Sequence, residues 1–97
     1  MTINEDKNGD ELIISLEGKL DAFTAPELQS ELEDSLEGIN KVIFDFSKLV
    51  YLSSAGIRVL FWLKKRLNEQ GKMTVRNASD RIKEIISCVG FSEILEV

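Results

Sequence analysis

Residues 42–61 constrain the fold of this chain more than any other stretch. Residues 42–46, Val-Ile-Phe-Asp-Phe, form a compact apolar run typical of a buried strand, and residues 57–67 show helical spacing of their apolar side chains. We predict a short turn between the strand and the helix, and a helix start at Ser53 and Ser54. Backbone N–H groups at a helix start lack intrahelical partners, so a hydroxyl there can cap the helix or accept a phosphate.

The composition suits one globular domain. The chain has 97 residues, of which 43 % are hydrophobic and 30 % charged, so residues 1–97 can bury one modest core. Its apolar runs are far shorter than the roughly 20 residues of a membrane span, and its first residues are polar and acidic, unlike a secretory signal. We therefore expect a cytoplasmic protein without membrane insertion. A monomer is the default expectation, since neither the acidic charge nor the length fixes an oligomeric state.

Several kinds of chemistry are excluded by the residues that the chain lacks. It has no histidine and one cysteine, Cys88, so histidine-based zinc sites, Ser–His–Asp triads and an internal disulfide cannot form. Its net charge of -5 argues against nucleic-acid binding, which needs a concentrated basic surface. We expect no catalytic residue, metal or cofactor.

The N-terminal half predicts a hairpin followed by a helix. Alternation over residues 11–18 is typical of a half-buried strand ended by Gly18, with an edge strand at residues 2–6 and a turn at residues 8–10. Thr24-Ala-Pro-Glu27 has the spacing of a capping box, so a helix begins near Ala25. Its apolar stripe is formed by Leu28, Leu32 and Leu36, and Gly38 ends the helix.

The C-terminal half continues the alternation of strands and helices. The junction helix should reach about Glu69, followed by a strand over residues 72–76 and a third helix capped by Ser79. Its apolar face is formed by Ile82, Ile85, Ile86 and Val89. Gly90 ends it, and an apolar tail follows over residues 91–97. The order predicts an α/β domain with a mixed, partly parallel central sheet and about four helices.

A helical projection of the junction helix separates two sides. Ile57, Leu60, Leu63 and Leu67 cluster toward the sheet, and Phe61, on their border, is expected in the core. Ser54, Arg58, Trp62 and Lys65 follow steps of three and four on the other side. An exposed Trp62 beside Arg58 has the composition of a partner-binding anchor. The alternative is that Trp62 packs under a neighbouring loop or the C-terminal segment.

These residues resemble a known family. Gly18-Lys-Leu-Asp21, Ile43-Phe-Asp-Phe-Ser47 and Ser53-Ser-Ala-Gly-Ile57 are similar to the STAS domain of bacterial anti-sigma factor antagonists, and the resemblance covers nearly the whole chain. The family junction usually reads Asp-Ser-Ser/Thr-Gly-Leu-Gly, which places its phosphorylated serine at Ser54. Ser53 stands in place of the aspartate, Ala55 in place of the second hydroxyl residue and Arg58 in place of the second glycine, so Ser53 is the second choice of acceptor.

The resemblance implies partner switching. The unphosphorylated domain would bind an anti-sigma factor that is also a serine kinase of the histidine-kinase-like ATPase fold. Phosphorylation would end that binding, and a PP2C-type phosphatase would restore it. The alternative is a non-switching STAS adaptor in a sensory assembly or beside a membrane transporter complex, with both serines serving as caps only.

Three further residues have expected roles at the junction. Asp21 is expected to contact the partner and to help the chain enter the first helix. Asp45 is expected to be structural, accepting hydrogen bonds from backbone N–H groups in the turn after its strand. Gly56 costs up to about 1 kcal/mol in a helix relative to alanine, which suggests a close approach to its backbone. Either the partner or a tight internal contact of helix and sheet could make that approach.

Overall fold

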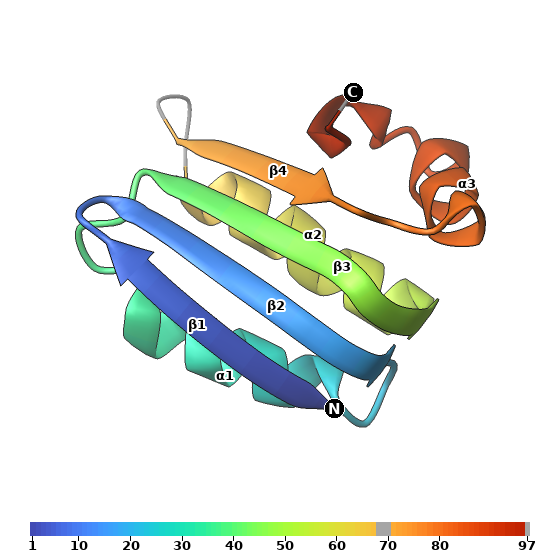
Figure 1. The fold of residues 1–97 in the computed structure, drawn as a ribbon, viewed down its shortest axis with the longest axis horizontal. Helices are drawn as coiled ribbons and strands as arrows, with labels where there is room; N and C mark the ends of the chain where they lie inside the picture. Colours follow the sequence, from blue (N-terminus) through green and yellow to red (C-terminus); the bar gives the residue numbers. More distant parts are fainter. Residues whose placement is uncertain (68–70, 97) are drawn as a thin grey trace.

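The computed structural model describes residues 1–67 and 71–96 as one sheet with helices packed against it (Figure 1). The strand order is β1-β2-β3-β4, with β1 antiparallel to β2 and the other neighbours parallel. The predicted α/β class and mixed sheet are confirmed. The described residues contain three α-helices and one short 3₁₀ helix. The elements are β1 (Thr2–Asn8), β2 (Glu11–Leu20), α1 (Ala25–Ser35), β3 (Lys41–Leu52), α2 (Ser54–Leu67), β4 (Lys72–Arg76), α3 (Asp80–Cys88) and η1 (Ser92–Ile94).

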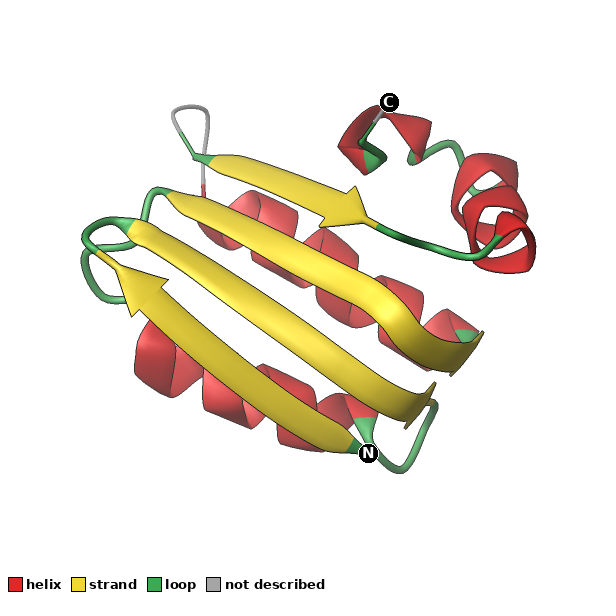
Figure 2. Cartoon of the chain, viewed as in Figure 1, coloured by secondary structure: helices red, strands yellow, loops and turns green. Residues whose placement is uncertain are grey.

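The core lies between the sheet and the two helices α1 and α2, which cover the same face (Figure 2). Alternate residues of β2 and β3 point toward these helices and are fully buried, as the strand period requires. The apolar stripe of α1 is buried against them, as its spacing predicts. The central buried side chains are Leu12, Ile14, Leu16, Leu28, Leu32, Val42, Phe44, Phe46, Leu60 and Leu63.

Both central strands are longer than the sequence predicts. β2 continues past Gly18 to Leu20, and β3 continues from Phe46 to Leu52. Two register shifts in the β2–β3 pairing absorb the irregular residues without ending the ladder, and Gly18 at φ +107° lies beside one of them. The stretch expected to be a turn before the junction is therefore strand. The two strands end side by side, with Leu20 paired to Leu52.

The third helix agrees with most of its prediction. The Ser79 hydroxyl accepts from the Ile82 N–H at 3.2 Å, and Gly90 has a left-handed φ of +77°. Val89, expected on the buried face, is 44 % exposed because α3 ends at Cys88 and the chain turns there. The junction helix reaches Leu67; the two further residues predicted for it lie outside the described residues.

The C-terminal segment is fixed along β4. Leu95 bridges Val75 in parallel, the Glu96 N–H donates to the Val75 carbonyl at 2.9 Å, and Arg76 Nε pairs with the Glu96 carboxylate at 3.2 Å. In Figure 1 this segment and α3 lie beside β4, away from α1. The segment therefore extends the sheet at the β4 edge.

Candidate switch and partner-binding site

Ser53 begins the junction as a helix cap. Its hydroxyl accepts from the Gly56 N–H at 3.3 Å, and its carbonyl accepts the first intrahelical bond of α2, from the Ile57 N–H at 3.0 Å. Its own N–H donates to the Leu20 carbonyl at 2.9 Å, which attaches the junction to the end of β2. Ser53 is half-buried. It satisfies one of the orphan N–H groups that every helix start carries.

Ser54 has a different environment. It is the first residue of α2 and is exposed to solvent. Within residues 1–67 and 71–96 its hydroxyl takes part in no side-chain hydrogen bond, whereas that of Ser53 does. The sequence left the two serines as alternatives for capping and modification. The structure gives the cap to Ser53 and leaves the Ser54 hydroxyl accessible beside the positive end of the helix dipole.

Gly56 is buried beneath the junction. A Cβ at this position would meet side-chain atoms of Leu20 and Leu52 at 2.7 and 2.8 Å. Of the two explanations that the sequence left open, the tight contact of helix and sheet is the one observed. The buried Gly56 sets how closely the start of α2 approaches the sheet.

Asp21 organises the turn between β2 and α1. Its carboxylate accepts from the N–H groups of Phe23 at 2.9 Å and Thr24 at 3.1 Å, as an N-cap side chain does. The hydrogen bond from the Thr24 backbone is the main cause that lowers the pKa of Asp21. The expectation that Asp21 helps the chain enter the helix is confirmed. Because Leu20 bonds Ser53, this turn also lies next to the junction.

The predicted capping box at Thr24 does not form. The Thr24 hydroxyl donates to the Lys19 carbonyl at 2.8 Å and accepts from the Asp21 N–H at 2.9 Å, so it faces back toward β2. No side-chain cap bond joins it to the first turn of α1. The Thr-x-x-Glu spacing is present, but Asp21 has already taken the capping role one turn earlier.

Asp45 lies within β3, away from the strand end. Its carboxylate accepts from the Ser47 N–H at 3.0 Å and from the Asn77 side-chain amide at 3.2 Å. The hydrogen bond from the Ser47 backbone is the first cause that lowers the pKa of Asp45, and the Asn77 bond adds to it. Asp45 thus accepts a backbone hydrogen bond as predicted, but the donor, Ser47, lies within β3 and not in a turn after it. Asp45 holds β3 to the loop after β4 instead of lying beside Ser53.

Arg58 and Trp62 follow Ser54 on α2, but they are not equally accessible. Arg58 is exposed and lines a shallow groove between α1 and α2, together with Ala22, Ala25, Pro26, Gln29, Ser30, Glu33, Ala55 and Val59. Trp62 is half-buried and packs against the core, so the expectation of an exposed tryptophan is only partly met. Arg58 and Val59, which precede Trp62 on α2, line the groove against α1, a neighbour that the projection of a single helix cannot reveal.

Phe61 lies on the other side of the helix. It was expected in the core, but it is 38 % exposed, and its ring packs on Phe91 with centroids 4.4 Å apart. This contact joins α2 to the C-terminal segment. The predicted packing of an aromatic residue of α2 under that segment therefore occurs at Phe61 instead of Trp62.

Sequence reasoning overlooked three exposed apolar residues at the same end of the sheet. Phe23 lies in the turn that Asp21 organises, and Val50 and Tyr51 lie near the end of β3. One signal was available for each group. Phe23 falls between the strand pattern and the helix pattern, and Val50 and Tyr51 are adjacent apolar residues that break the alternation of a one-sided strand.

A comparison with protein families identifies this arrangement, since the STAS domain model matches residues 2–97. The chain belongs to the STAS domain family. BtrV of Bordetella bronchiseptica, which carries the name of an anti-sigma factor antagonist, is 31 % identical over 99 residues, covering 100 % of this chain and 85 % of BtrV. The anti-sigma-B factor antagonist of Listeria monocytogenes is 30 % identical over 96 residues, covering 96 % of this chain and 83 % of the relative.

Solved structures share the fold. The anti-sigma factor antagonist SpoIIAA in its unphosphorylated form has a TM-score of 0.90 at 15 % identity, covering 98 % of this STAS domain and 86 % of that chain. The Bacillus cell fate determinant SpoIIAA in the phosphorylated form has a TM-score of 0.81 at 15 % identity, covering 98 % of this STAS domain and 89 % of that chain.

Two further observations concern the described residues as a whole. In residues 1–67 and 71–96, no three or more His, Cys, Asp or Glu side chains are grouped so that they could hold a metal ion. None of the helices in that part of the chain has both the length and the apolar character needed to span a bilayer.

Proposed function

We propose that this STAS domain is an anti-sigma factor antagonist that works by partner switching. In its unphosphorylated form it binds an anti-sigma factor that is a serine kinase of the histidine-kinase-like ATPase fold. Phosphorylation of Ser54 by that kinase ends the binding, and a PP2C-type phosphatase restores it. The domain is the substrate and switch of this cycle and performs no catalysis of its own. The names of its relatives in Bordetella and Listeria support this assignment.

The division of roles between the two serines carries the proposal. A kinase must bring the acceptor hydroxyl to the γ-phosphate of ATP, and the exposed Ser54 hydroxyl can be reached from solvent. Ser53 is half-buried, and its hydroxyl is bonded to the Gly56 N–H. To be modified, the half-buried Ser53 hydroxyl would have to leave its hydrogen bond to the Gly56 N–H and reach the kinase, whereas Ser54 can be modified without moving the cap of α2.

A phosphate on Ser54 changes the surface more than the fold. It adds a charge of about -1.5 to -2 at a helix N-terminus, where the dipole and the exposed N–H groups favour an anion. In a complex, this hydrated group must be desolvated against the partner, at a cost that is large unless a cation meets it. A loss of about 3 kcal/mol there corresponds to about a hundredfold in affinity.

Residues around Ser54 form the proposed partner surface. Arg58 lies one turn further along α2 and is exposed, and Asp21 lies beside the junction through the Leu20–Ser53 hydrogen bond. Trp62 offers only the part of its ring that the core leaves uncovered. The proposal places the domain in the cytoplasm, where such a kinase finds ATP.

The deciding experiment is phosphorylation by the candidate kinases of the source organism. The full chain, Ser54→Ala and Ser53→Ala are each incubated with ATP and each kinase, followed by intact mass and peptide mapping. We expect one phosphate on the wild type and on Ser53→Ala, and none on Ser54→Ala. Phosphate on Ser53 would overturn the choice of acceptor. Absence of phosphate with every kinase would favour the non-switching adaptor, in which both serines only shape the helix start.

A further inference from the structure

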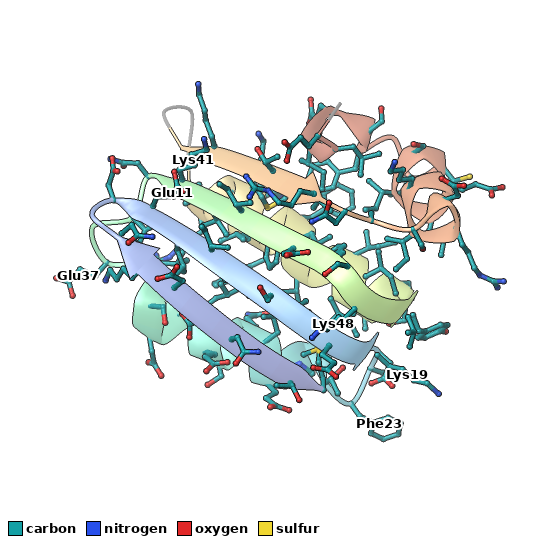
Figure 3. The ribbon with its side chains drawn as sticks, viewed as in Figure 1. Glu11, Lys19, Phe23, Glu37, Lys41 and Lys48 are labelled. Carbon is teal, nitrogen blue, oxygen red and sulfur yellow. The ribbon has the colours of Figure 1, made fainter. Side chains whose placement is uncertain are left out.

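Phe23 has a 91 % exposed side chain, the highest value among the large apolar residues of the described part of the chain. Figure 3 shows it projecting away from the domain at the same corner as Lys19. Single exposed apolar residues are common on protein surfaces. Two more exposed apolar residues, Val50 and Tyr51, lie at the same end of the sheet, and Tyr51 pairs with Lys19 in the β2–β3 register. We call these three residues the Phe23 patch.

The turn that carries Phe23 is held by a network of hydrogen bonds. Asp21 accepts from the N–H groups of Phe23 and Thr24, and its own carbonyl accepts from the Ala25 N–H at 2.8 Å. The Thr24 hydroxyl then fastens the turn to the Lys19 carbonyl at 2.8 Å. An exposed aromatic ring on such a fixed backbone binds with little further loss of conformational entropy, which is the property of an interface anchor.

The same turn lies beside the switch residue. Leu20, which precedes it, accepts the Ser53 N–H at 2.9 Å, and Ala22 lines the same groove as Ala55 and Arg58. The Phe23 patch therefore adjoins the start of α2 across the ends of two parallel strands. A partner that covers Ser54 and extends a short way toward β2 would also cover Phe23.

We infer that Phe23 is the principal apolar anchor for the serine-kinase partner, with Val50 and Tyr51 completing its contact; the inference rests on the proposed function. The kinase fits better than the phosphatase, because antagonism needs a complex that persists, whereas a phosphatase releases its product after each turnover. Stable interfaces bury about 800 Å² per partner around a few aromatic anchors.

The surrounding charges define the chemistry of the partner surface. The chain has a net charge of -5, yet two exposed cations lie near this turn: Lys19 precedes it in β2, and Arg58 lines the same groove as Ala22. The carboxylate of Asp21 is occupied by the N–H groups of the turn. A complementary partner presents an apolar pocket for Phe23 with acidic residues at its border. A phosphate on Ser54 would oppose that acidic border, which connects the anchor to the switch.

The test compares Phe23→Ala with Val89→Ala, which removes an exposed apolar side chain at the end of α3. Binding of each unphosphorylated full chain to the kinase that phosphorylates Ser54 is measured by titration calorimetry. We expect Phe23→Ala to raise the dissociation constant by about 30-fold or more, as the loss of a hot-spot residue does. Val89→Ala should change the dissociation constant less than about twofold. Both variants should unfold at the wild-type temperature, because neither side chain is in the core.

Each other outcome is decisive. If the wild type binds and Phe23→Ala binds equally well, the anchor is wrong and the proposed function stands. If the wild type binds no candidate kinase, the proposed function fails and the inference fails with it. If Phe23→Ala leaves kinase affinity unchanged but slows dephosphorylation of the phosphorylated chain, the patch belongs to the phosphatase and the inference is overturned.

Discussion

Gly56 approaches Leu20 so closely that a Cβ on its backbone would lie 2.7 Å from the Cγ of Leu20. Both residues are buried, and Leu20 is the last residue of β2. The first turn of α2 thus rests directly on the ends of the central strands. This contact fixes the distance between the helix start, which carries Ser53 and Ser54, and the turn that carries Asp21.

We predict that Gly56→Ala destabilises the domain. Alanine gains up to about 1 kcal/mol in a helix over glycine, but the inserted methyl would force apart a packed contact, which typically costs about 1–3 kcal/mol. The net change in the free energy of unfolding should be a loss of about 1 kcal/mol, measured by urea denaturation. In a Leu20→Ala background the same substitution should cost less, because the contacts of the added methyl with Leu20 are removed and only the contact with Leu52 remains. A more stable Gly56→Ala single variant would show that the contact is loose.

We predict that Ser53→Ala is more destabilising than Ser54→Ala. Only Ser53 accepts an N–H of the helix start, so its loss should lower the free energy of unfolding by about 1 kcal/mol, whereas Ser54→Ala should change it by less than about 0.5 kcal/mol. Chemical denaturation of both variants measures the difference. Ser53→Asp, which keeps a capping oxygen, serves as the control and should restore most of the loss. Equal stability of the two alanine variants would refute the cap.

We predict that Asp45 stabilises the domain at neutral pH. Hydrogen bonds from the Ser47 N–H and Asn77 lower its pKa below the ordinary value of 3.8. A carboxylate with a depressed folded-state pKa contributes stability above its unfolded pKa, and that stability is lost as pH falls through the folded pKa. Asp45→Asn should therefore be less stable at pH 7 and lose less stability on acidification below about pH 5.

Urea unfolding from pH 7 to pH 2 tests this prediction. The exposed Asp6→Asn variant makes the same change of charge on β1 and is the control. Its stability should follow the wild-type pH profile. Parallel profiles for the wild type and Asp45→Asn would show that the hydrogen bonds of Asp45 do not favour its ionised form.

The pKa of Glu31 is shifted in the opposite direction from that of Asp45. Burial is the largest cause that raises its pKa above the ordinary 4.5, followed by the nearby charge of Glu5. A group with a raised folded-state pKa favours the fold while protonated, and this contribution is lost as pH rises through the folded pKa. Glu31→Gln should raise the free energy of unfolding at pH 7 by about 0.3 kcal/mol, the scale of one like-charge pair on a helix. At pH 3 the gain should vanish. Glu84→Gln on α3, with the same charge change, should show neither effect.

The features that the sequence predicted well are those set by local interactions. The last strand has the predicted bounds, Ser79 caps α3 through the next turn, and Leu28 and Leu32 are buried at their helical spacing. Each depends on residues within about four positions along the chain. The start of α2 belongs to the same class, because a capping serine needs only the N–H three residues later.

The features that were missed depend on residues of other helices and strands. β3 extends to Leu52 because β2 pairs with it through two irregularities, which no pattern within β3 alone reveals. Thr24 has the spacing of a capping residue, but the Lys19 carbonyl, which lies in another element, takes its hydroxyl. A helical projection of α2 shows on which side of the helix Phe61 lies. It does not show where Phe91 lies, and the contact with Phe91 decides how much of the Phe61 ring is covered.

The last prediction separates charge from shape at Ser54. Ser54→Asp should fold with wild-type stability, within about 0.5 kcal/mol, because an anion in the first turn of a helix is favoured by the dipole. It should bind the kinase about a hundredfold more weakly, since the buried charge meets no cation in an acidic partner border. Ser54→Asn has nearly the same shape without the charge and is the matched control, measured by the same calorimetry. If Ser54→Asn loses as much affinity as Ser54→Asp, the size of the side chain explains the loss, and a switch based on phosphate charge is contradicted.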